Sequence, residues 1–362
     1  MNRDIFENLF VLEMTNNHLG NLERGLKIVH EHSRVVRFNN VRAAIKLQFR
    51  DVKNFVHKDF QTRKDIRYVK RVLETKMSKA DYAVLVEAIK KSGCIPMATP
   101  FDEKSVDWCV DFGFPIIKIA SADSNDWILL EKIASTRKPC IISFGATPLK
   151  DMDDVVTFFE HRNVPLAINH CIAAYPHEDS ECELEQIDFL RNRYPGHTIG
   201  WSSHECKDWD TSVKIAYAKG ARTFERHIDI NNDGFQVASY SSLPEQLDHW
   251  FKAFHKAVEF CGTSRTERKL ALSKETAYLD TYIRGVYAKR ALKVGQIITE
   301  DDIYMAIPLQ KGQISCRELM LGRFGHKVTK AIKADAPIRI DDVDTPYSEN
   351  DHLKQLIYNR GI

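Results

Sequence analysis

The sequence has no apolar run close to the roughly 18–20 residues that a membrane-spanning helix needs. Its 52 basic and 50 acidic side chains leave a formal net charge of only +2, so no overall field attracts nucleic acid or a membrane surface. Asp4 and Glu7 precede any apolar stretch at the N-terminus, which speaks against a signal peptide. We therefore expect a cytoplasmic protein with neither a nucleic-acid nor a membrane partner.

Paired cysteine motifs are also missing. The eight cysteines are scattered, and no two of them stand in a CxxC arrangement. In a chain of 362 residues this pattern indicates reduced thiols rather than a disulfide framework. The hydrophobic share of 43% and the charged share of 28% are ordinary for a globular protein. The length allows one domain of about 250 residues and a smaller second one.

What the chain does contain is an alternation of short apolar runs with longer amphipathic stretches. The amphipathic stretches, for example 105–112 and 151–161, predict helices. Eight such strand–helix units in about 250 residues predict an α/β protein with a (β/α)8 barrel (a TIM barrel) rather than an open doubly wound sheet. The charged stretch 51–91 exceeds one crossover helix, and we expect an insertion there that covers the barrel mouth. The predicted strands are 10–17, 43–49, 95–100, 116–121, 140–145, 166–171, 198–203 and 223–228.

The composition changes after the predicted barrel. We predict a barrel domain at 1–262 and a polar linker at 263–283. Short apolar runs punctuated by Gly and Asp then predict a small β-rich domain at 284–346, with a C-terminal tail at 347–362.

Polar residues collect at the carboxyl ends of the predicted strands. In a barrel these ends meet at one concave face, where the chemistry of such folds takes place. A polar residue there therefore favours a functional interpretation more than one elsewhere. The residues at these ends include Glu13, Lys46, Gln48, Thr99, Lys118, Ser121, Ser143, His170, Tyr175, His204, Glu225 and His227.

The two lysines are the clearest of these signals. A lone strand lysine usually extends its amine to solvent or pairs with a carboxylate, and for Lys46 alone that interpretation stays open. Two lysines in apolar strands are costlier, because a buried ammonium needs an anion to neutralise it. Glu13 is a candidate partner for one, and the other is expected to need a ligand anion such as phosphate or carboxylate.

The two histidines admit two interpretations. A single histidine is more often a satisfied core residue than a ligand. His204 and His227 lie at the ends of adjacent predicted strands and can instead share one divalent ion through their imidazole nitrogens. The hydroxyls of Thr99 and Ser143 can equally cap the helices that follow them.

The chain resembles the N-acetylneuraminate (sialic acid) synthase family in the strings EMTNNHLGNLERGLKIV, IKLQ, ATPFDEKSVDW, IKIASAD, HCIAAYP, GWSSHE and FERHI. It also resembles that family's C-terminal antifreeze-like (SAF) domain in RGVYAKRALKVGQIITEDDI and IKADAPIRIDDVD. The resemblance runs from about Leu12 to Val343, nearly the whole chain. It implies a metal-dependent condensation of phosphoenolpyruvate with a mannosamine-type aldehyde, giving a nonulosonic acid and free phosphate.

The resemblance also implies roles for individual residues. It makes Glu13 a candidate for proton handling, and it implies that His204 and His227 hold Mn²⁺, with Mg²⁺ or Co²⁺ as alternatives. It implies a domain-swapped homodimer in which the antifreeze-like domain closes the partner's site. Phosphoenolpyruvate would be held by Lys46, Thr99, Lys118, Ser121 and Ser143, and further substrate contacts would come from Gln48, His170, Tyr175 and Tyr287.

Departures from the family pattern lie on the sugar side. Ala173 stands where family members that make N-acetylneuraminate can have a polar residue, and Ile307 stands where the family has an arginine that contacts the acetamido group. Asp233 matches a family aspartate only loosely, and Arg317 or Arg323 is a candidate replacement for the missing arginine. We therefore predict an intact phosphoenolpyruvate half and an acceptor that is not simply N-acetylmannosamine. A differently substituted deoxy-amino sugar, or an aldose that lacks the acetamido group, is expected instead.

Two other functions stay open. The first is a related 3-deoxy-ulosonate synthase that uses a different aldose or a sugar phosphate. A phosphorylated acceptor would need a second basic cluster at the barrel mouth. The second is a catalytically silent sugar-binding relative, against which the costly buried charges argue. Candidates for the basic cluster are Arg50, Lys53, Arg63 and Lys64, which are more simply interpreted as a solvated charged face.

Overall fold

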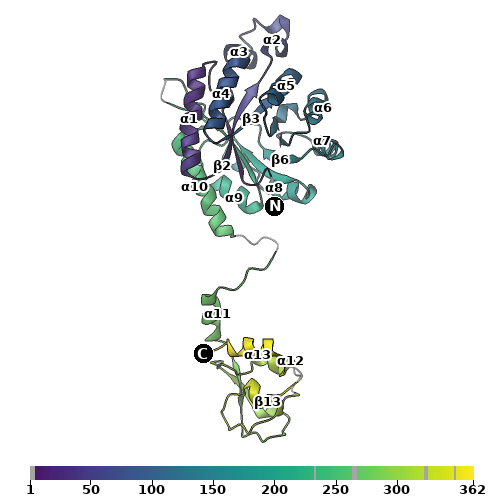
Figure 1. Cartoon of the computed structure of the whole chain (residues 1–362), viewed down its shortest axis with the longest axis vertical. Helices are drawn as coiled ribbons and strands as arrows, with labels where there is room; N and C mark the ends of the chain where they lie inside the picture. Colours follow the sequence, from purple (N-terminus) through teal and green to yellow (C-terminus); the bar gives the residue numbers. More distant parts are fainter. Residues whose placement is uncertain (1–4, 232–233, 263–266, 322–324, 346–347) are drawn as a thin grey trace. The chain divides into compact units, whose positions relative to one another are not determined.

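The computed structural model describes residues 5–231, 234–262, 267–321, 325–345 and 348–362. The chain divides into two compact units, Met1–Thr263 and Ser264–Ile362 (Figure 1). None of the helices in the described ranges is long and apolar enough to cross a membrane.

The first unit is a closed barrel of eight parallel strands. β1 pairs with both β2 and β8, which closes the sheet, and the two-residue strand β9 (Ser241–Ser242) is added beside β8. The predicted barrel is therefore confirmed. The strands are β1 (Leu9–Glu13), β2 (Arg42–Phe49), β3 (Ile95–Pro100), β4 (Ile117–Ile119), β5 (Cys140–Phe144), β6 (Leu166–Cys171), β7 (Thr198–Ser203) and β8 (Thr223–Ile228).

A helix follows each strand and covers the outside of the barrel (Figure 1). The first predicted strand, 10–17, is too long, because the backbone turns after Glu13 with Asn17 N donating to Met14 O at 3.0 Å. The helices are α1 (Leu22–Phe38), α4 (Lys79–Lys91), α5 (Glu103–Asp111), α6 (Trp127–Ser135), α7 (Leu149–His161), α8 (Glu185–Arg193), α9 (Thr211–Lys219) and α10 (Pro244–Cys261).

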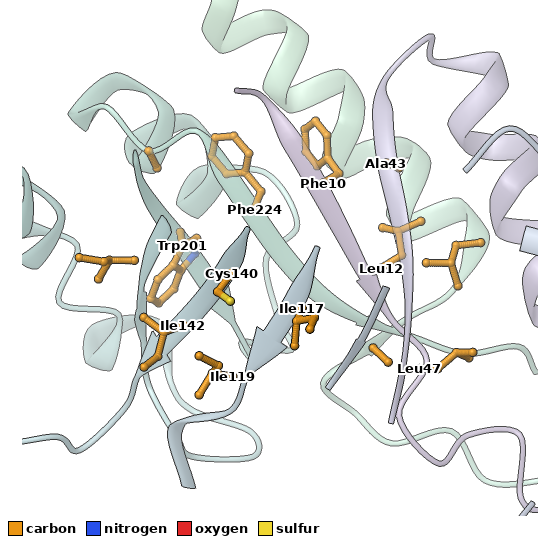
Figure 2. Packing of buried hydrophobic residues seen from close by; sticks show 14 of the residues in the cluster. Phe10, Leu12, Ala43, Leu47, Ile117, Ile119, Cys140, Ile142, Trp201 and Phe224 are labelled. Atoms are coloured by element: carbon orange, nitrogen blue, oxygen red, sulfur yellow. The ribbon is translucent and has the colours of Figure 1, made fainter. Parts of the chain in front are cut away.

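Alternate residues of each strand point to opposite faces of the barrel wall. One set packs outward against the helices, as Figure 2 shows for Phe10 and Phe224, whose ring centroids lie 5.3 Å apart. The other set forms a separate inner core toward the amino ends of the strands. Its members are Phe6, Leu9, Val11, Ala44, Met97, Ile116, Ile141 and Ala167.

Toward the carboxyl ends the inward positions become polar. Two residues after Val11 comes Glu13, two after Ala44 comes Lys46, and two after Ile141 comes Ser143. Because side chains alternate along a strand, the inward-facing positions form the apolar inner core at the amino ends and line the polar cavity at the carboxyl ends.

Between plug and cavity lies a tightly packed polar layer. Thr223 Oγ1 donates to Asn169 Oδ1 at 2.5 Å. Gly200 of β7 lies against this pair, and a Cβ at Gly200 would lie 1.8 Å from Thr223 Oγ1 and 2.2 Å from Asn169 Oδ1. The close approach of the strands here therefore requires glycine.

The predicted insertion 51–91 contains α2 (Val52–Phe55), the 3-10 turn η1 (Lys58–Phe60), α3 (Arg67–Glu74) and α4. α4 packs against α1 and β3 and serves as the regular crossover helix. It begins with a capping box between Ser78 and Asp81. The segment from α2 to α3 is the additional part, and α3 contributes side chains to the barrel mouth, as predicted.

The second unit is small and rich in short strands. Its core contains Val286, Ile314, Ile338 and Ile340 among others. The residues predicted as a C-terminal tail are part of this unit instead, because Ile357 of α13 is buried in the same core. The predicted linker likewise contains a helix, α11. The elements are α11 (Ser273–Asp280), β10 (Gly285–Ala288), β11 (Ile303–Ala306), α12 (Cys316–Leu321), β12 (Lys327–Val328), β13 (Val343–Asp344) and α13 (Asp351–Tyr358), with the 3-10 turns η4 (Glu300–Asp302) and η5 (Ile340–Asp342).

Candidate active site

A cavity of about 630 Å³ lies at the carboxyl ends of the barrel strands. Each of the eight strands contributes a side chain to its lining, and every predicted site residue except His170 and Tyr287 is among the residues that line it. From β1 to β8 in order, the strands contribute Glu13, Lys46, Thr99, Lys118, Ser143, Cys171, Ser202 and Glu225.

Lys46 is a fully compensated cation on the cavity floor. Its ammonium forms ion pairs with Glu13 and, at 3.1 Å, with Glu225, and it donates to Thr99 Oγ1 at 2.9 Å. Burial alone would lower the pKa of Lys46, but the two carboxylates outweigh burial and raise it. Lys46 therefore stays charged, and its pairing with Glu13 agrees with the predicted neutralisation.

Lys118 is compensated much less. Its Nζ donates to Ser143 Oγ and to the carbonyl of Ile119, both at 2.8 Å, and its nearest carboxylate, Glu225, is 3.9 Å away. Burial lowers the pKa of Lys118, and the attraction of Glu225 only partly offsets it. Lys118 is thus the cation for which a bound anion would add the missing counter-charge.

The pKa values of the two floor carboxyl groups are shifted in opposite directions. Burial raises the pKa of Glu13 above its ordinary value despite the adjacent Lys46. Burial would do the same to Glu225, but Lys118 and Lys46 outweigh it and lower the pKa. Opposed pKa shifts in neighbouring carboxyls are typical of sites that separate a proton carrier from a fixed anion. Glu13 can carry a proton, whereas Glu225 remains the anion between the two lysines.

Glu225 was among the polar residues expected at the strand ends, but the sequence prediction gave it no role in the site. Glu225 and His227 stand two apart in β8, so both face the cavity. The strand period, which the sequence already shows, is the signal that places Glu225 on the same face as His227.

His204 and His227 are brought together as predicted, with ring centroids 5.2 Å apart. Burial lowers the pKa of His204 to about 4 and that of His227 well below its ordinary value, so both rings are neutral near pH 7. Nδ1 of His204 lies 2.7 Å from the carbonyl of Ile172 and donates to it, which leaves the lone pair on Nε2.

The arrangement of the two rings fits a divalent ion. Nδ1 of His227 is buried without a hydrogen-bond partner. Two neutral imidazoles, one of them with an unpaired buried nitrogen, are donors that Mn²⁺ or a similar ion accepts. Within the described ranges, no three His, Cys, Asp or Glu side chains cluster in a way that could hold a metal. An ion here would therefore need water or substrate oxygens as further ligands.

A buried network behind the histidines fixes their positions. Arg226 precedes His227, Glu205 follows His204, and the two form an ion pair at 2.7 Å. Arg226 also donates to the Glu205 carbonyl at 2.8 Å. The backbone N–H of His204 donates to His177 Nε2 at 3.2 Å. Each partner of this salt bridge is next in sequence to one of the two histidines. The salt bridge therefore holds the ends of β7 and β8 together on the side away from the cavity.

The predicted hydroxyl groups lie along one side of the floor. Thr99 and Ser143 accept hydrogen bonds from Lys46 and Lys118 respectively, so neither serves as a helix cap. Ser121, in the 3-10 turn η2 (Ser121–Asp123), accepts from Gly145 N at 3.0 Å.

The residues predicted to contact the sugar separate into two groups. Gln48 and Tyr175 line the cavity, and the Tyr175 ring lies 4.0 Å from that of His204. His170 does not line it: His170 stacks on Trp201 with centroids 5.0 Å apart, and its Nε2 lies 2.8 Å from Cys182 O. The reason is the strand alternation, which turns Cys171 inward and His170 outward. The prediction for His170 is therefore wrong in position.

Three arginines lie at the cavity mouth, and we refer to Arg50, Arg67 and Arg71 together as the arginine rim. Within the described ranges, no carboxylate forms a salt bridge with any of them. Of the four basic residues considered from the sequence, only Arg50 lines the cavity. The sequence prediction missed Arg67 and Arg71, and it named Lys53, Arg63 and Lys64, which lie outside the lining.

The residues expected in the SAF-like region lie in the second unit. Tyr287 is buried there, donates to Pro308 O at 2.5 Å and stacks on Tyr304. Ile307 is exposed. Ala173 lines the barrel cavity, which places this departure on the substrate side. Asp233 and Arg323 lie outside the described residues.

Comparison with known proteins shows that the chain belongs to the NeuB family. Residues 39–266 match the NeuB family model, and residues 283–344 match the SAF domain model. The chain is 36% identical to a solved structure assigned as spore coat polysaccharide biosynthesis protein E from Chromobacterium violaceum, with a TM-score of 0.89 and coverage of 93% of this chain and 100% of that one.

Two named relatives indicate the range of activities. N-acetylneuraminate-9-phosphate synthase of Drosophila melanogaster is 30% identical over 229 residues, covering 61% of this chain and 60% of that protein. Pseudaminic acid synthase of Campylobacter jejuni is 25% identical over 309 residues, covering 82% of this chain and 86% of that protein.

Proposed function

Because the chain belongs to the NeuB family and carries a SAF domain, we propose that it condenses phosphoenolpyruvate with an open-chain sugar aldehyde. The products are a nonulosonic acid similar to sialic acid and free phosphate. The observation that carries the proposal is the juxtaposition, in one cavity, of the under-compensated Lys118 with the neutral pair His204 and His227.

Phosphoenolpyruvate occupies the floor in this proposal. Lys118 supplies the uncompensated positive charge, and the hydroxyls of Ser143 and Ser121 lie beside it as donors to carboxylate or phosphate oxygens. Lys46 holds Thr99 and Glu13 in place from the neighbouring strand. These groups are ordered before the ligand binds, which is how fixed charges contribute most to catalysis.

The acceptor lies between the floor and the mouth. Gln48 and Tyr175 are positioned to contact its hydroxyls, and His204 and His227 to hold a divalent ion, with Mn²⁺ as our first choice and Mg²⁺ or Co²⁺ as alternatives. The chemistry that such an ion supplies when bound is Lewis-acid polarisation of the aldehyde oxygen.

The reaction forms one carbon–carbon bond. C3 of phosphoenolpyruvate attacks the aldehyde carbon, and positive charge develops at C2. Water adds to C2, and the tetrahedral intermediate loses phosphate, so that phosphoenolpyruvate, aldehyde and water are converted to sugar acid and phosphate. Glu13, whose pKa burial raises, is the group that we assign to the proton transfers.

We also propose a homodimer in which the SAF domain contributes to the partner's site, with Tyr287 as the aromatic residue concerned. The eight free cysteines agree with a reducing cytoplasm, where phosphoenolpyruvate is available. Light scattering on the full chain tests the dimer, and activity recovered on mixing inactive Lys118→Met and Tyr287→Ala subunits tests the exchange.

Release of phosphate from phosphoenolpyruvate, measured with a panel of aldoses, tests the proposed reaction. We expect turnover with a six-carbon amino or deoxy sugar, loss of turnover on chelation, and recovery with Mn²⁺. Best turnover with N-acetylmannosamine would overturn the predicted shift in acceptor. Turnover only with shorter aldoses would favour a 3-deoxy-ulosonate synthase. No turnover and no Mn²⁺ binding would favour a silent sugar-binding relative.

A further inference from the structure

The arginine rim differs from the floor lysines in its ion pairing. The floor lysines Lys46 and Lys118 have carboxylates within 4.0 Å. By contrast, Arg50, Arg67 and Arg71 have no ion-pair partner in the described parts of the chain. The lining therefore contains five cationic side chains and two carboxylates, Glu13 and Glu225, and the excess lies at the mouth.

Arg50 is held in place by neutral groups rather than by an anion. Its guanidinium lies over the Phe101 ring at 3.8 Å, and Nη2 donates to Gln48 Oε1 at 2.8 Å and to Tyr68 OH at 3.0 Å. The side chain is 8% exposed, and Nε is buried without a hydrogen-bond partner. Arg50 therefore contributes an ordered positive charge to the cavity lining that no carboxylate in the described ranges neutralises.

Arg67 and Arg71 stand four residues apart on α3, so they lie on one face of that helix. Both line the cavity, as does Tyr68. Neighbouring charges of the same insertion behave differently: Arg63 pairs with Asp65 at 2.6 Å, and Lys64 lies 3.8 Å from Glu74. Arg63 and Lys64, which lie outside the cavity lining, thus have a carboxylate nearby, whereas Arg67 and Arg71, which line the cavity, have none in the described parts of the chain.

The cavity is large enough to hold more than the phosphoenolpyruvate proposed to bind at its floor. A volume of about 630 Å³ falls in the range of sites that enclose drug-sized ligands, whereas phosphoenolpyruvate alone is far smaller. With phosphoenolpyruvate on the floor lysines, the rim faces the end of the acceptor that is farthest from its aldehyde.

We propose that the acceptor carries an anionic group at this far end and that the arginine rim binds this group. This proposal rests on the proposed function. The group is a phosphate or a carboxylate, both of which match the planar fork of guanidinium donors. Gln48 links the rim to the sugar-binding side chains, because it accepts from Arg50. Selection among acceptors therefore depends on the charge of the far end as well as on the substituents near the aldehyde.

Calorimetry with unreactive open-chain probes tests the rim directly. The full-length protein is titrated with mannitol, mannitol 1-phosphate and mannonate, which have no aldehyde and differ in their terminal charge. We expect at least one anionic probe to bind about 10- to 100-fold more tightly than mannitol, as charge-assisted hydrogen bonds imply. Preference for mannitol 1-phosphate identifies a phosphate, and preference for mannonate identifies a carboxylate.

Variants on α3 assign any preference to the rim. The double variant Arg67→Ala/Arg71→Ala is expected to bind all three probes within about 3-fold of each other. Arg63→Ala, on the same insertion but outside the cavity, is the matched control and keeps the preference. Arg67→Lys/Arg71→Lys preserves the charge and part of the preference if the alanine pair disturbs folding. Equal binding of the three probes by the natural protein, or an unchanged preference in both α3 double variants, would overturn the proposal.

Turnover then separates the rim from the phosphoenolpyruvate site. In Arg67→Ala/Arg71→Ala we expect KM to rise for an anionic aldose, such as a hexose 6-phosphate or a hexuronate, and KM for phosphoenolpyruvate to change less than about 2-fold. An equal rise in both values would assign the rim to phosphoenolpyruvate and overturn the proposal. Absence of turnover with every aldose contradicts the proposed reaction instead, and the calorimetric result then decides the rim by itself.

Discussion

The floor and the rim of the cavity are both cationic, but they hold their charges in opposite ways. On the floor, Lys46 is buried and paired with Glu13 and Glu225. On the rim, Arg67 is exposed and Arg71 half-buried, and neither has a carboxylate partner in the described ranges. Lys118 lies between these extremes, buried but only loosely paired. Compensated charges stabilise the protein's own anions, whereas uncompensated ones are available to a ligand.

The largest expected effect is on stability, from Lys46→Met. This change leaves Glu13 and Glu225 buried without their main counter-ion, and removing one partner of a buried ion pair costs about 3–5 kcal/mol. Urea denaturation measures the loss of unfolding free energy. Lys150→Met, which breaks an exposed pair with Asp154, is the control and should cost less than about 1 kcal/mol. A loss equally small in Lys46→Met would contradict the structural role of Lys46.

Lys118→Met should instead separate activity from stability. We expect kcat to fall by about 10²- to 10³-fold, the usual effect of removing one preorganised electrostatic group. The melting temperature should stay the same or rise, because burial already disfavours the charged form of Lys118 in the free protein. Phosphate release and thermal unfolding measure the two quantities. A stability loss as large as that of Lys46→Met would show that both lysines are neutralised equally in the folded protein, which would contradict the weaker pairing of Lys118.

The smallest expected effect concerns Asp123, a carboxyl in the fields of both Arg50 and Lys118. Burial raises the pKa of Asp123 from 3.8 to about 7. The folded state therefore holds this proton more tightly than the unfolded state, and the associated stability is lost as pH rises from about 4 through about 7. Asp123→Asn removes the ionisation.

Thermal unfolding of Asp123→Asn at two pH values measures this effect. We expect the melting temperature to rise by about 2–4 °C at about pH 8.5 and by less than about 1 °C at about pH 5, which corresponds to roughly 1 kcal/mol. An equal shift at both pH values would indicate a packing effect instead.

Much of the floor could be predicted from the sequence. Glu13, Lys46, Lys118, His204 and His227 stand at the carboxyl ends of apolar strands, and strand geometry requires them to converge once the barrel closes. The same alternation shows that Glu225 faces inward and His170 outward. The prediction for His170 failed because it considered how far along the strand the residue lies but not which face of the strand it occupies.

The rim could not be predicted in the same way. Arg67 and Arg71 belong to an insertion with no strand register to position it, and the sequence there shows only a charged, amphipathic stretch. Which of its basic residues face the cavity depends on how α3 packs over the mouth, as the pairing of Arg63 with Asp65 illustrates.

The sequence by itself determined the barrel and the polar inner face of its carboxyl ends, because a period of two residues and a short strand length are local properties. Only the tertiary structure decided which charges are neutralised. Lys46 lies between two carboxylates from β1 and β8, strands distant in sequence that meet beside β2 where the barrel closes, while Lys118 is left with one carboxylate at 3.9 Å. Ion pairing falls off over a few ångströms, and separations on that scale are fixed by barrel closure and helix packing rather than by any segment alone.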